Sequence, residues 1–317
     1  MRSIIVGASG QDGTILLEKI LAENEAVLAI SSGYTRLYGK GQTSVEHVDI
    51  LDSLAVNRAI EGFAPTHVYY LAAYHHSSEE EKPAEFELFK KSFEVHSLGL
   101  LNFLEGIRQF KPDTRLFYAS SSLIFGSNPA VDIATEETPW QPDCAYSISK
   151  VAGMHLCKYY RKKHGVFASC GIMFNHESQF RSSKFVSKKI INGVVSIKHG
   201  DQQYIEIGDI AAGADFGYAP DYVEAMVKIM NSDQPDDFII ATGEVHTVKD
   251  WLEIAFALAG LDLKGGIIYK NDVLTRKRKI LAGSYTKLYQ STGWEPRHGF
   301  KEMVELLFFK QLSEKNI

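Results

Sequence analysis

Cysteine and long apolar runs are scarce in this sequence. Its 317 residues include only three cysteines, Cys144, Cys157 and Cys170, which form neither a CxxC pair nor a metal-ligand spacing. This scarcity argues against a disulfide framework and against a bound metal, so a reduced, cytoplasmic setting is expected. No apolar run approaches membrane-spanning length, and residues 1–8 are predicted to form a strand rather than a signal peptide.

A strong excess of charge is also missing. The 34 basic and 39 acidic residues give a net charge of −5, so the balance gives no reason to expect nucleic acid or an anionic membrane as a partner. What remains is a globular composition, 45% hydrophobic and 23% charged. A chain of this kind can bury one large core or two modest ones.

A glycine-rich motif follows the first apolar run. Residues 3–6 are predicted to be a strand, residues 7–13 read GASGQDG, and a helical pattern continues to residue 21. In this order, the amides of the turn and the positive end of the helix can hold a pyrophosphate, although a plain tight turn would show the same pattern. We therefore predict a dinucleotide site. Its expected residues are Gly7, Gly10, Gln11, Asp12 and Gly13.

The end of the second predicted strand, residues 26–30, bears on the choice of cofactor. An NAD site usually has a carboxylate here for the ribose 2′-hydroxyl, whereas this chain has Ser31, Ser32 and Gly33. Arg36, expected in a loop, could meet a 2′-phosphate or could be an ordinary solvated charge. NADP is therefore slightly favoured over NAD.

Two further strand ends are expected to contact the cofactor. Residues 45–48 are predicted to be a third strand ending at Asp49 and Ile50, where the carboxylate would accept a hydrogen bond from the adenine amine or would instead cap a helix. Residues 67–73 are predicted to be a fourth strand, whose small terminal residues would let the cofactor lie against the backbone. These terminal residues are Leu71, Ala72 and Ala73.

Strands alternate with helices along the first half of the chain. Helices are predicted over 53–63 and 85–110, and a fifth strand over 114–119. This alternation predicts an α/β fold with a doubly wound parallel sheet of the Rossmann type, whose ligands bind beyond the carboxyl ends of the strands. His75, His76 and the serines at 120–122 follow such ends, so we expect them at the site.

The central chemical motif is YSISK, residues 146–150. If a helix begins at residue 145, Tyr146 and Lys150 lie on one face, with the ammonium beside the phenol. The positive charge would lower the pKa of the phenol, so that Tyr146 could take a proton from a substrate hydroxyl while a nicotinamide takes the hydride. Ser121 would orient the substrate oxygen. The spacing alone is commoner in ordinary amphipathic helices, and the accompanying motifs favour the catalytic interpretation.

Taken together, these motifs resemble the extended short-chain dehydrogenases/reductases that act on nucleotide sugars, and most of all the GDP-mannose 4,6-dehydratases. The resemblance covers nearly the whole chain. It is carried by GASGQDG at 7–13, YLAA at 70–73, YASSSLIFG at 118–126, Tyr146 with Lys150, FNHES at 174–178, DFGYAPDYVEAM at 215–226, and TGWEP at 292–296.

The resemblance implies an arrangement of domains and subunits. The cofactor domain would comprise residues 1–172 with about 215–243, and a smaller substrate domain about 173–214 with 244–317. Similar proteins build a four-helix dimer interface from the helices that correspond to 85–110 and 146–163. A homodimer or homotetramer is therefore expected.

One departure from the family bears on the reaction. The dehydratases carry a glutamate at the position of Leu123, where it removes a proton from carbon 5 of a 4-keto sugar before water is eliminated. Leucine cannot exchange a proton, so hydride transfer at carbon 4 of a GDP-linked hexose or heptose, without dehydration, is expected. The alternatives are a dehydratase whose base has moved to His75, His76 or Cys144, a 4-epimerase, and a non-enzymatic dinucleotide sensor.

The resemblance also suggests contacts for the substrate. Asn175 would donate to a substrate phosphate, although a structural asparagine would look the same. The arginine of the family's RDWGH motif is Ala214 here, and the basic pair after NHES is reduced to Arg181, which lowers the positive charge available to a nucleoside diphosphate. The predicted substrate contacts are His75, His76, Ser122, Asn175, Arg181, Lys188, Arg276 and Arg278, with Lys189 as a further candidate phosphate ligand.

Overall fold

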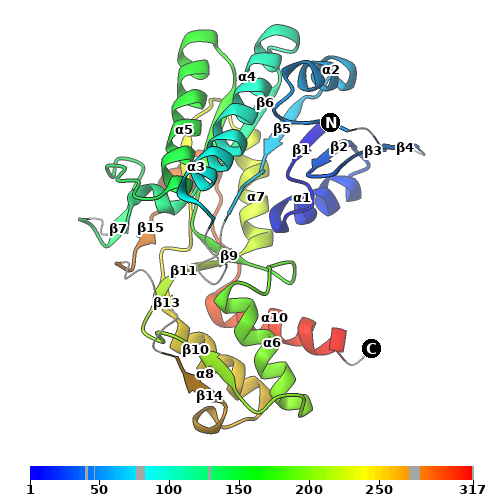
Figure 1. Cartoon of the computed structure of the whole chain (residues 1–317). Helices are drawn as coiled ribbons and strands as arrows, with labels where there is room; N and C mark the ends of the chain where they lie inside the picture. Colours follow the sequence, from blue (N-terminus) through cyan, green and yellow to red (C-terminus); the bar gives the residue numbers. More distant parts are fainter. Residues whose placement is uncertain (40–41, 46, 76–82, 128–129, 271–278, 316–317) are drawn as a thin grey trace.

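The computed structural model describes residues 1–39, 42–45, 47–75, 83–127, 130–270 and 279–315. Three residues predicted for the site, His76, Arg276 and Arg278, lie outside these ranges. The chain forms a large α/β part, drawn at the top of Figure 1, and a smaller part below it that contains α6, α8 and α10.

An eight-stranded sheet forms the centre of the larger part. Its order is β12-β8-β6-β5-β1-β2-β3-β4, and the strands from β12 to β2 are parallel. This confirms the predicted parallel sheet. The strands are β1 (Arg2–Val6), β2 (Ala26–Ser31), β3 (Tyr34–Gly39), β4 (Gln42–Val45), β5 (His67–Tyr70), β6 (Arg115–Ala119), β8 (Ala168–Met173) and β12 (Asp237–Ile240).

The prediction of a third parallel strand over residues 45–48 was wrong. β3 turns back at Gly33, which has a φ of +90°, and pairs antiparallel with β2, and β4 then pairs antiparallel with β3. This hairpin fills the sheet edge, so the following residues form only a connection to α2. There the carboxylate of Asp49 accepts the Leu51 amide at 2.9 Å. Arg36, expected in a loop, lies on β3.

Helices cover both faces of this sheet because the strand side chains alternate. Ile4, Val68 and Leu116 pack with α2, α4 and α5, whereas Ile5 and Phe117 pack with α1 and α7. All five side chains are fully buried. The helices are α1 (Gln11–Ala22), α2 (Ser53–Phe63), α4 (Gly99–Phe110), α5 (Ala145–His164) and α7 (Ala219–Met230).

The helix predicted over residues 85–110 is interrupted by one wider turn. α3 (Glu85–Phe93) continues into a π-helical turn, η1 (Glu94–Leu98), and then into α4. In Figure 1, α3, α4 and α5 lie side by side. Turns of this kind are rare and are frequent at functional sites.

The smaller part has a core of its own, formed by α6, α8, α10 and neighbouring strands. Its centre includes the buried side chains of Ile190, Trp251 and Phe308. Along the described residues, no helix combines the length and apolar character needed to cross a membrane. The remaining elements are η2 (Ser122–Phe125), β7 (Ile133–Ala134), β9 (Asn175–Glu177), α6 (Val186–His199), β10 (Ile205–Ile207), β11 (Gly213–Tyr218), β13 (Val245–Thr247), α8 (Val248–Ala259), η3 (Leu263–Gly265), β14 (Ile267–Tyr269), β15 (Ala282–Gly283), α9 (Thr286–Thr292) and α10 (Phe300–Lys315).

Candidate active site

The glycine turn between β1 and α1 has no room for side chains. A Cβ on Gly7 would lie 2.7 Å from the Ala72 backbone nitrogen, and one on Gly13 would lie 2.3 Å from the Gly7 carbonyl oxygen. Gly10 precedes α1, and no side chain caps that helix end. The turn therefore presents bare backbone beside a helix N-terminus, which is the surface that a dinucleotide pyrophosphate requires.

An acid–base pair ties this turn to β9. The two carboxylate oxygens of Asp12 each lie 3.0 Å from Nε2 of His176. Burial alone would raise the pKa of Asp12, but His176 and Arg181 outweigh it and hold the pKa below its usual value. Burial alone would likewise lower the pKa of His176, but Asp12 raises it. The positive charge of His176 thus offsets an acid that would otherwise repel a pyrophosphate.

A second pair of hydrogen bonds supports the same junction. The amide of Gln11 donates to the His176 carbonyl at 3.0 Å, and the Ser178 hydroxyl donates to the Gln11 side-chain oxygen at 2.8 Å. Sequence reasoning included Gln11 and Asp12 but did not single out His176 or Ser178. The FNHES motif was the available signal, because it contains both residues: His176 on β9 and Ser178 directly after that strand.

The residues expected to surround the adenosine and nicotinamide lie near the carboxyl ends of β2 and β5. Ser31 ends β2, and its hydroxyl donates to the Tyr34 carbonyl at 3.2 Å. The Arg36 guanidinium lies 5.0 Å from the centre of the Tyr34 ring. Leu71 and Ala72 follow β5, where Ala72 faces Gly7. The remaining predicted contacts are Ala73, which follows Ala72, and Ile50, whose carbonyl accepts the Asn102 amide.

The predicted catalytic residues meet at the carboxyl end of β6. A helix does begin at Ala145, and Lys150 is buried beneath Tyr146, with Nζ 5.6 Å from the Tyr146 ring centre. Ser121 follows β6, and its hydroxyl is near enough to the Tyr146 phenol to help lower the pKa of that phenol against burial. Tyr146, Lys150 and Ser121 thus form one cluster at the sheet edge where ligands of such folds bind.

The expected effect of Lys150 on the phenol was wrong. Burial raises the pKa of Tyr146 to about 12, and burial lowers the pKa of Lys150 to about 7. The ammonium of Lys150 instead donates to the Ala119 carbonyl at 2.7 Å. The dry surroundings disfavour the charged forms of both groups. The cation that lowers the pKa of the phenol is Arg181, which acts against the effect of burial.

Aromatic rings enclose Tyr146 on two sides. His75 meets the Tyr146 ring edge-on with centroids 5.5 Å apart, and the ring of His75 lies 5.4 Å from that of Phe185. The Arg181 guanidinium lies 3.5 Å from the centre of the Phe185 ring. On the other side lies His96, 4.9 Å from the Tyr146 ring. His96 was missed from the sequence because a lone histidine inside an apolar helix carries no spacing signal.

The remaining predicted substrate residues are divided between the site and its surroundings. Ser122 begins η2, directly after Ser121, and Asn175 is exposed at the start of β9. Arg181 approaches Glu177, with Nε 3.2 Å from a carboxylate oxygen. Lys188 is engaged elsewhere, because its ammonium donates to the Gln179 carbonyl and the Gln311 side chain. Lys188 thus ties α6 to α10.

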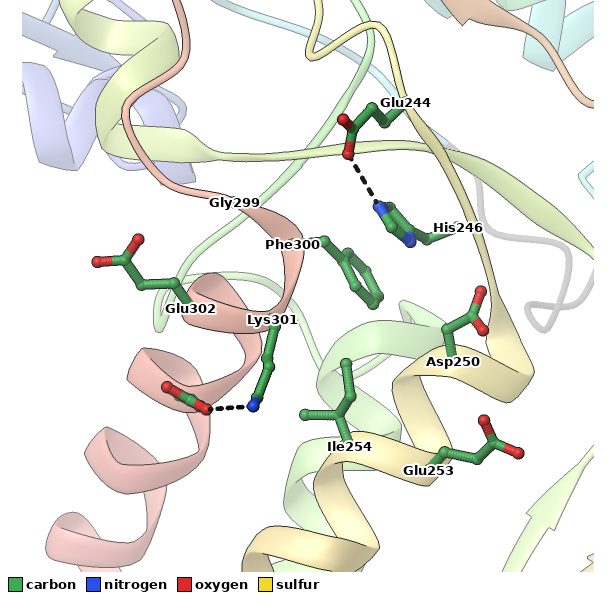
Figure 2. Close-up of a pocket in the computed structure, with 10 residues that line it drawn as sticks. Glu244, His246, Asp250, Glu253, Ile254, Gly299, Phe300, Lys301 and Glu302 are labelled. Atoms are coloured by element: carbon green, nitrogen blue, oxygen red, sulfur yellow. Dashed lines mark ion pairs between the residues drawn. The ribbon is translucent and has the colours of Figure 1, made fainter.

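Two hollows lie in the smaller part of the molecule. Figure 2 shows the first, of about 640 Å³, between β13, α8 and α10, where the His246 ring stacks on Phe300 and Glu244 lies 3.7 Å from His246. None of the predicted site residues within the described ranges lines it. The second, of about 590 Å³, lies beside α6 and includes Lys189 and Asn192.

The fold and the Tyr146 cluster define an extended short-chain dehydrogenase/reductase. The sequence profile of the family described as GDP-mannose 4,6 dehydratase matches residues 4–307. GDP-mannose 4,6 dehydratase 1 of Arabidopsis thaliana is 32% identical over 98% of this chain and 89% of its own. The protein therefore belongs to the GDP-mannose 4,6-dehydratase family, a group of NAD(P)-dependent nucleotide-sugar enzymes.

Solved structures share the fold at lower identity. RMD from Pseudomonas aeruginosa, complexed with NADPH, has a TM-score of 0.81 at 21% identity and covers 99% of both chains. UDP-glucose 4-epimerase from Thermotoga maritima, with UDP-glucose, has a TM-score of 0.83 at 19% identity, covering 100% of this chain and 99% of its own. At these identities the likeness concerns the fold alone.

Proposed function

We propose that this protein is an NAD(P)-dependent oxidoreductase that moves a hydride at carbon 4 of a nucleotide-linked hexose or heptose, without dehydration. The observation that carries the proposal is the meeting of Tyr146, Ser121 and Lys150 beside the bare glycine turn. A bound nicotinamide would accept or return the hydride. Tyr146 would exchange the proton of the 4-hydroxyl, and Ser121, next to the same phenol, would orient the sugar oxygen.

The position of Leu123 supports a reaction that stops at hydride transfer. Leu123 is in the first turn of η2, and its amide donates to the Ser121 hydroxyl at 3.3 Å. A hydrocarbon side chain two residues from the proposed catalytic serine cannot take a proton from carbon 5 of the sugar. Oxidation at carbon 4 can proceed without that step, whereas loss of the 6-hydroxyl cannot.

Product analysis tests this proposal. With GDP-mannose and an oxidised cofactor, the wild-type protein is expected to give no 6-deoxy-4-keto product in mass spectra, because no acid stands at residue 123. Leu123→Glu is expected to gain that product, and Leu123→Gln, which has the same length but accepts no proton, is not. Formation of the dehydrated product by the wild-type protein would overturn the non-dehydrating reaction.

A dehydratase with a relocated base is the second candidate. Family membership favours it, and so does the His75 ring next to Tyr146, because an imidazole can exchange protons near neutral pH. If this candidate is correct, the wild-type protein dehydrates the sugar nucleotide and the His75→Gln variant does not.

A 4-epimerase would instead interconvert two sugar nucleotides without net use of cofactor. A non-enzymatic sensor would have no need for the intact Tyr146, Ser121 and Lys150 cluster.

The second hollow supports a substrate with a long polar tail. Lys189 and Asn192 share one face of α6, and Phe185 is the N-cap residue of that helix. Phe185 contacts His75 beside Tyr146, and the hollow is lined by Ser183, two residues before Phe185, as well as by Lys189 and Asn192. Within the described chain, the side-chain oxygen of Asn192 is buried without a hydrogen-bond partner. A nucleoside diphosphate, expected to be GDP, could extend along this face from a sugar at Tyr146.

For the cofactor, we propose a modest preference for NADP(H). Support comes from the absence of an acid at Ser31 and from Arg36 on the neighbouring strand. Replacing Arg36 by glutamine is expected to weaken NADPH binding about tenfold and to leave NADH binding unchanged, because the lost hydrogen bond involves a charged group. Fluorescence titration measures the affinities for NADPH and for NADH, and Arg58→Gln on α2 is the control. Tighter binding of NADH by the wild-type protein would contradict the preference.

We also propose a homodimer formed through α3, η1, α4 and α5. Their surface exposes Phe86 by 73%, Leu98 by 51% and Tyr159 by 50%. Sedimentation is expected to show a dimer that Leu98→Asp weakens, because a charge would be buried in the contact. Phe309→Asp on α10, at a residue exposed by 55%, is the control. A monomer at micromolar concentration would refute the assembly.

A further inference from the structure

His96 lies inside the π-helical turn η1, and both of its ring nitrogens have partners. Its side chain is completely buried. The Tyr74 amide donates to Nε2 at 2.9 Å. Because an amide can only donate, Nε2 must carry the lone pair and Nδ1 the proton. Nδ1 therefore donates to the Ser149 hydroxyl at 2.8 Å, and that hydroxyl donates to the Tyr146 carbonyl at 2.9 Å.

Two buried tyrosines hold the turn that carries His96. The Tyr70 hydroxyl donates to the Val95 carbonyl at 2.6 Å, and the Tyr118 hydroxyl donates to the His96 carbonyl at 3.0 Å. Both acceptors lie within the π-helical turn, where the ordinary helical hydrogen-bond pattern is broken. Strands β5 and β6 thus provide the donors that stabilise the turn.

Glycines make room for these two hydroxyls. A Cβ on Gly99 would lie 2.4 Å from the Tyr70 hydroxyl oxygen, and one on Gly153 would lie 2.4 Å from the Tyr118 hydroxyl oxygen. Gly99 begins α4, and Gly153 is on α5. The close approach of both helices to the strands therefore fixes the position of the His96 backbone.

From this arrangement we infer that His96 is a positioning residue for Tyr146 in the proposed reaction. It connects Tyr74, in the loop after β5, to Ser149 on α5, whose hydroxyl donates to the Tyr146 carbonyl. Its ring also meets the Tyr146 ring edge-on, at an interplanar angle of 79°. A neutral imidazole in this place sets where the phenol points, and it exchanges no proton with the substrate.

The charge state of His96 agrees with a positioning role. Burial, with smaller contributions from Lys150 and His75, holds the pKa of His96 well below its usual value. The imidazole therefore stays neutral throughout the working pH range.

Variants that break one hydrogen bond at a time test the inference. In His96→Gln, the side-chain amide keeps an acceptor for the Tyr74 amide and loses the hydrogen bond to Ser149. In His96→Asn, the shorter side chain keeps a donor for Ser149 and loses the acceptor for Tyr74. We expect kcat to fall about 10- to 100-fold in His96→Gln and in Ser149→Ala, and by no more than about threefold in His96→Asn, because small misplacements of a reacting group are costly. Cofactor affinity and KM should stay within about threefold of wild type.

A double-variant comparison separates positioning from general damage. His96→Gln with Ser149→Ala should be no slower than either single variant, because both changes break the same chain of hydrogen bonds. The controls are His67→Gln, at a buried histidine at the opposite end of β5, and Ser169→Ala, at a buried serine on β8. Wild-type kcat in His96→Gln and Ser149→Ala, or additive losses in the double variant, would overturn the inference.

A measurement without substrate keeps this inference separate from the proposed function. In ¹⁵N NMR spectra of histidine-labelled protein, His96 should show a proton on Nδ1 and should not titrate between about pH 5.5 and 8.5. Its Nδ1 resonance should shift in Ser149→Ala. If the wild-type protein turns over no nucleotide sugar, the proposed function fails, and these spectra still decide the placement of His96. A proton on Nε2, or titration near pH 6.5, would refute that placement.

Discussion

Tyr146→Phe is expected to lower kcat by about 10²- to 10⁴-fold, the range typical of losing a general acid–base group. The phenyl ring keeps its edge contacts with His75 and His96, so the fold and the glycine turn should be unaffected. Only the hydroxyl that would exchange the proton in the proposed reaction is removed. Steady-state kinetics with a nucleotide sugar that the wild-type protein converts measure the loss of kcat. Cofactor titration measures whether the glycine turn still binds the dinucleotide.

The control for this change lies on another helix. Tyr289 is half exposed on α9, and Tyr289→Phe removes an equivalent hydroxyl outside the site and outside the proposed dimer surface. It should leave kcat unchanged. Undiminished turnover in Tyr146→Phe would remove Tyr146 from the chemistry, and a lost affinity for cofactor would mean that the phenol acts in binding instead.

Asp215→Asn is expected to cause a large loss of stability. The carboxylate is fully buried and accepts four hydrogen bonds: from the Thr242 amide and hydroxyl at 2.9 and 2.7 Å, the Gly243 amide at 2.9 Å, and the Gly283 amide at 3.1 Å. An amide nitrogen in place of one oxygen would face donors rather than acceptors. The free energy of unfolding should fall by about 3 kcal/mol or more.

Urea denaturation followed by circular dichroism measures that loss. Asp209→Asn is the matched control, because Asp209 is an exposed aspartate whose carboxylate accepts one amide, that of Ala211, at 2.8 Å. Its expected effect is below about 0.5 kcal/mol. An equal midpoint for Asp215→Asn and wild type would mean that the buried hydrogen bonds around Asp215 contribute nothing to stability.

The parallel sheet could be predicted from local pattern because each buried strand is a short apolar run beside a helical one. Helix α2 matches its predicted range of 53–63, and α5 begins at the predicted residue. The third strand could not be predicted in the same way. Tyr34–Gly39 is only partly buried, and its pairing with β2 depends on the sheet edge that it fills.

The pKa of the phenol shows a second limit of sequence reasoning. A four-residue spacing does place Lys150 near Tyr146, but the spacing says nothing about how dry the surroundings are. Burial under β6 directs the ammonium to the Ala119 carbonyl and raises the pKa of the phenol. The effective cation, Arg181, comes from a segment 35 positions later in the chain.

The sequence by itself determined the class of fold, the bare glycine turn and the presence of Tyr146, Lys150 and Ser121, because each depends on neighbours within a few residues. Only the tertiary structure decided the partners of Asp12 and His96 and the pKa of the phenol. Those properties arise between segments far apart in the chain, and they depend on distance and burial, which a linear pattern does not contain.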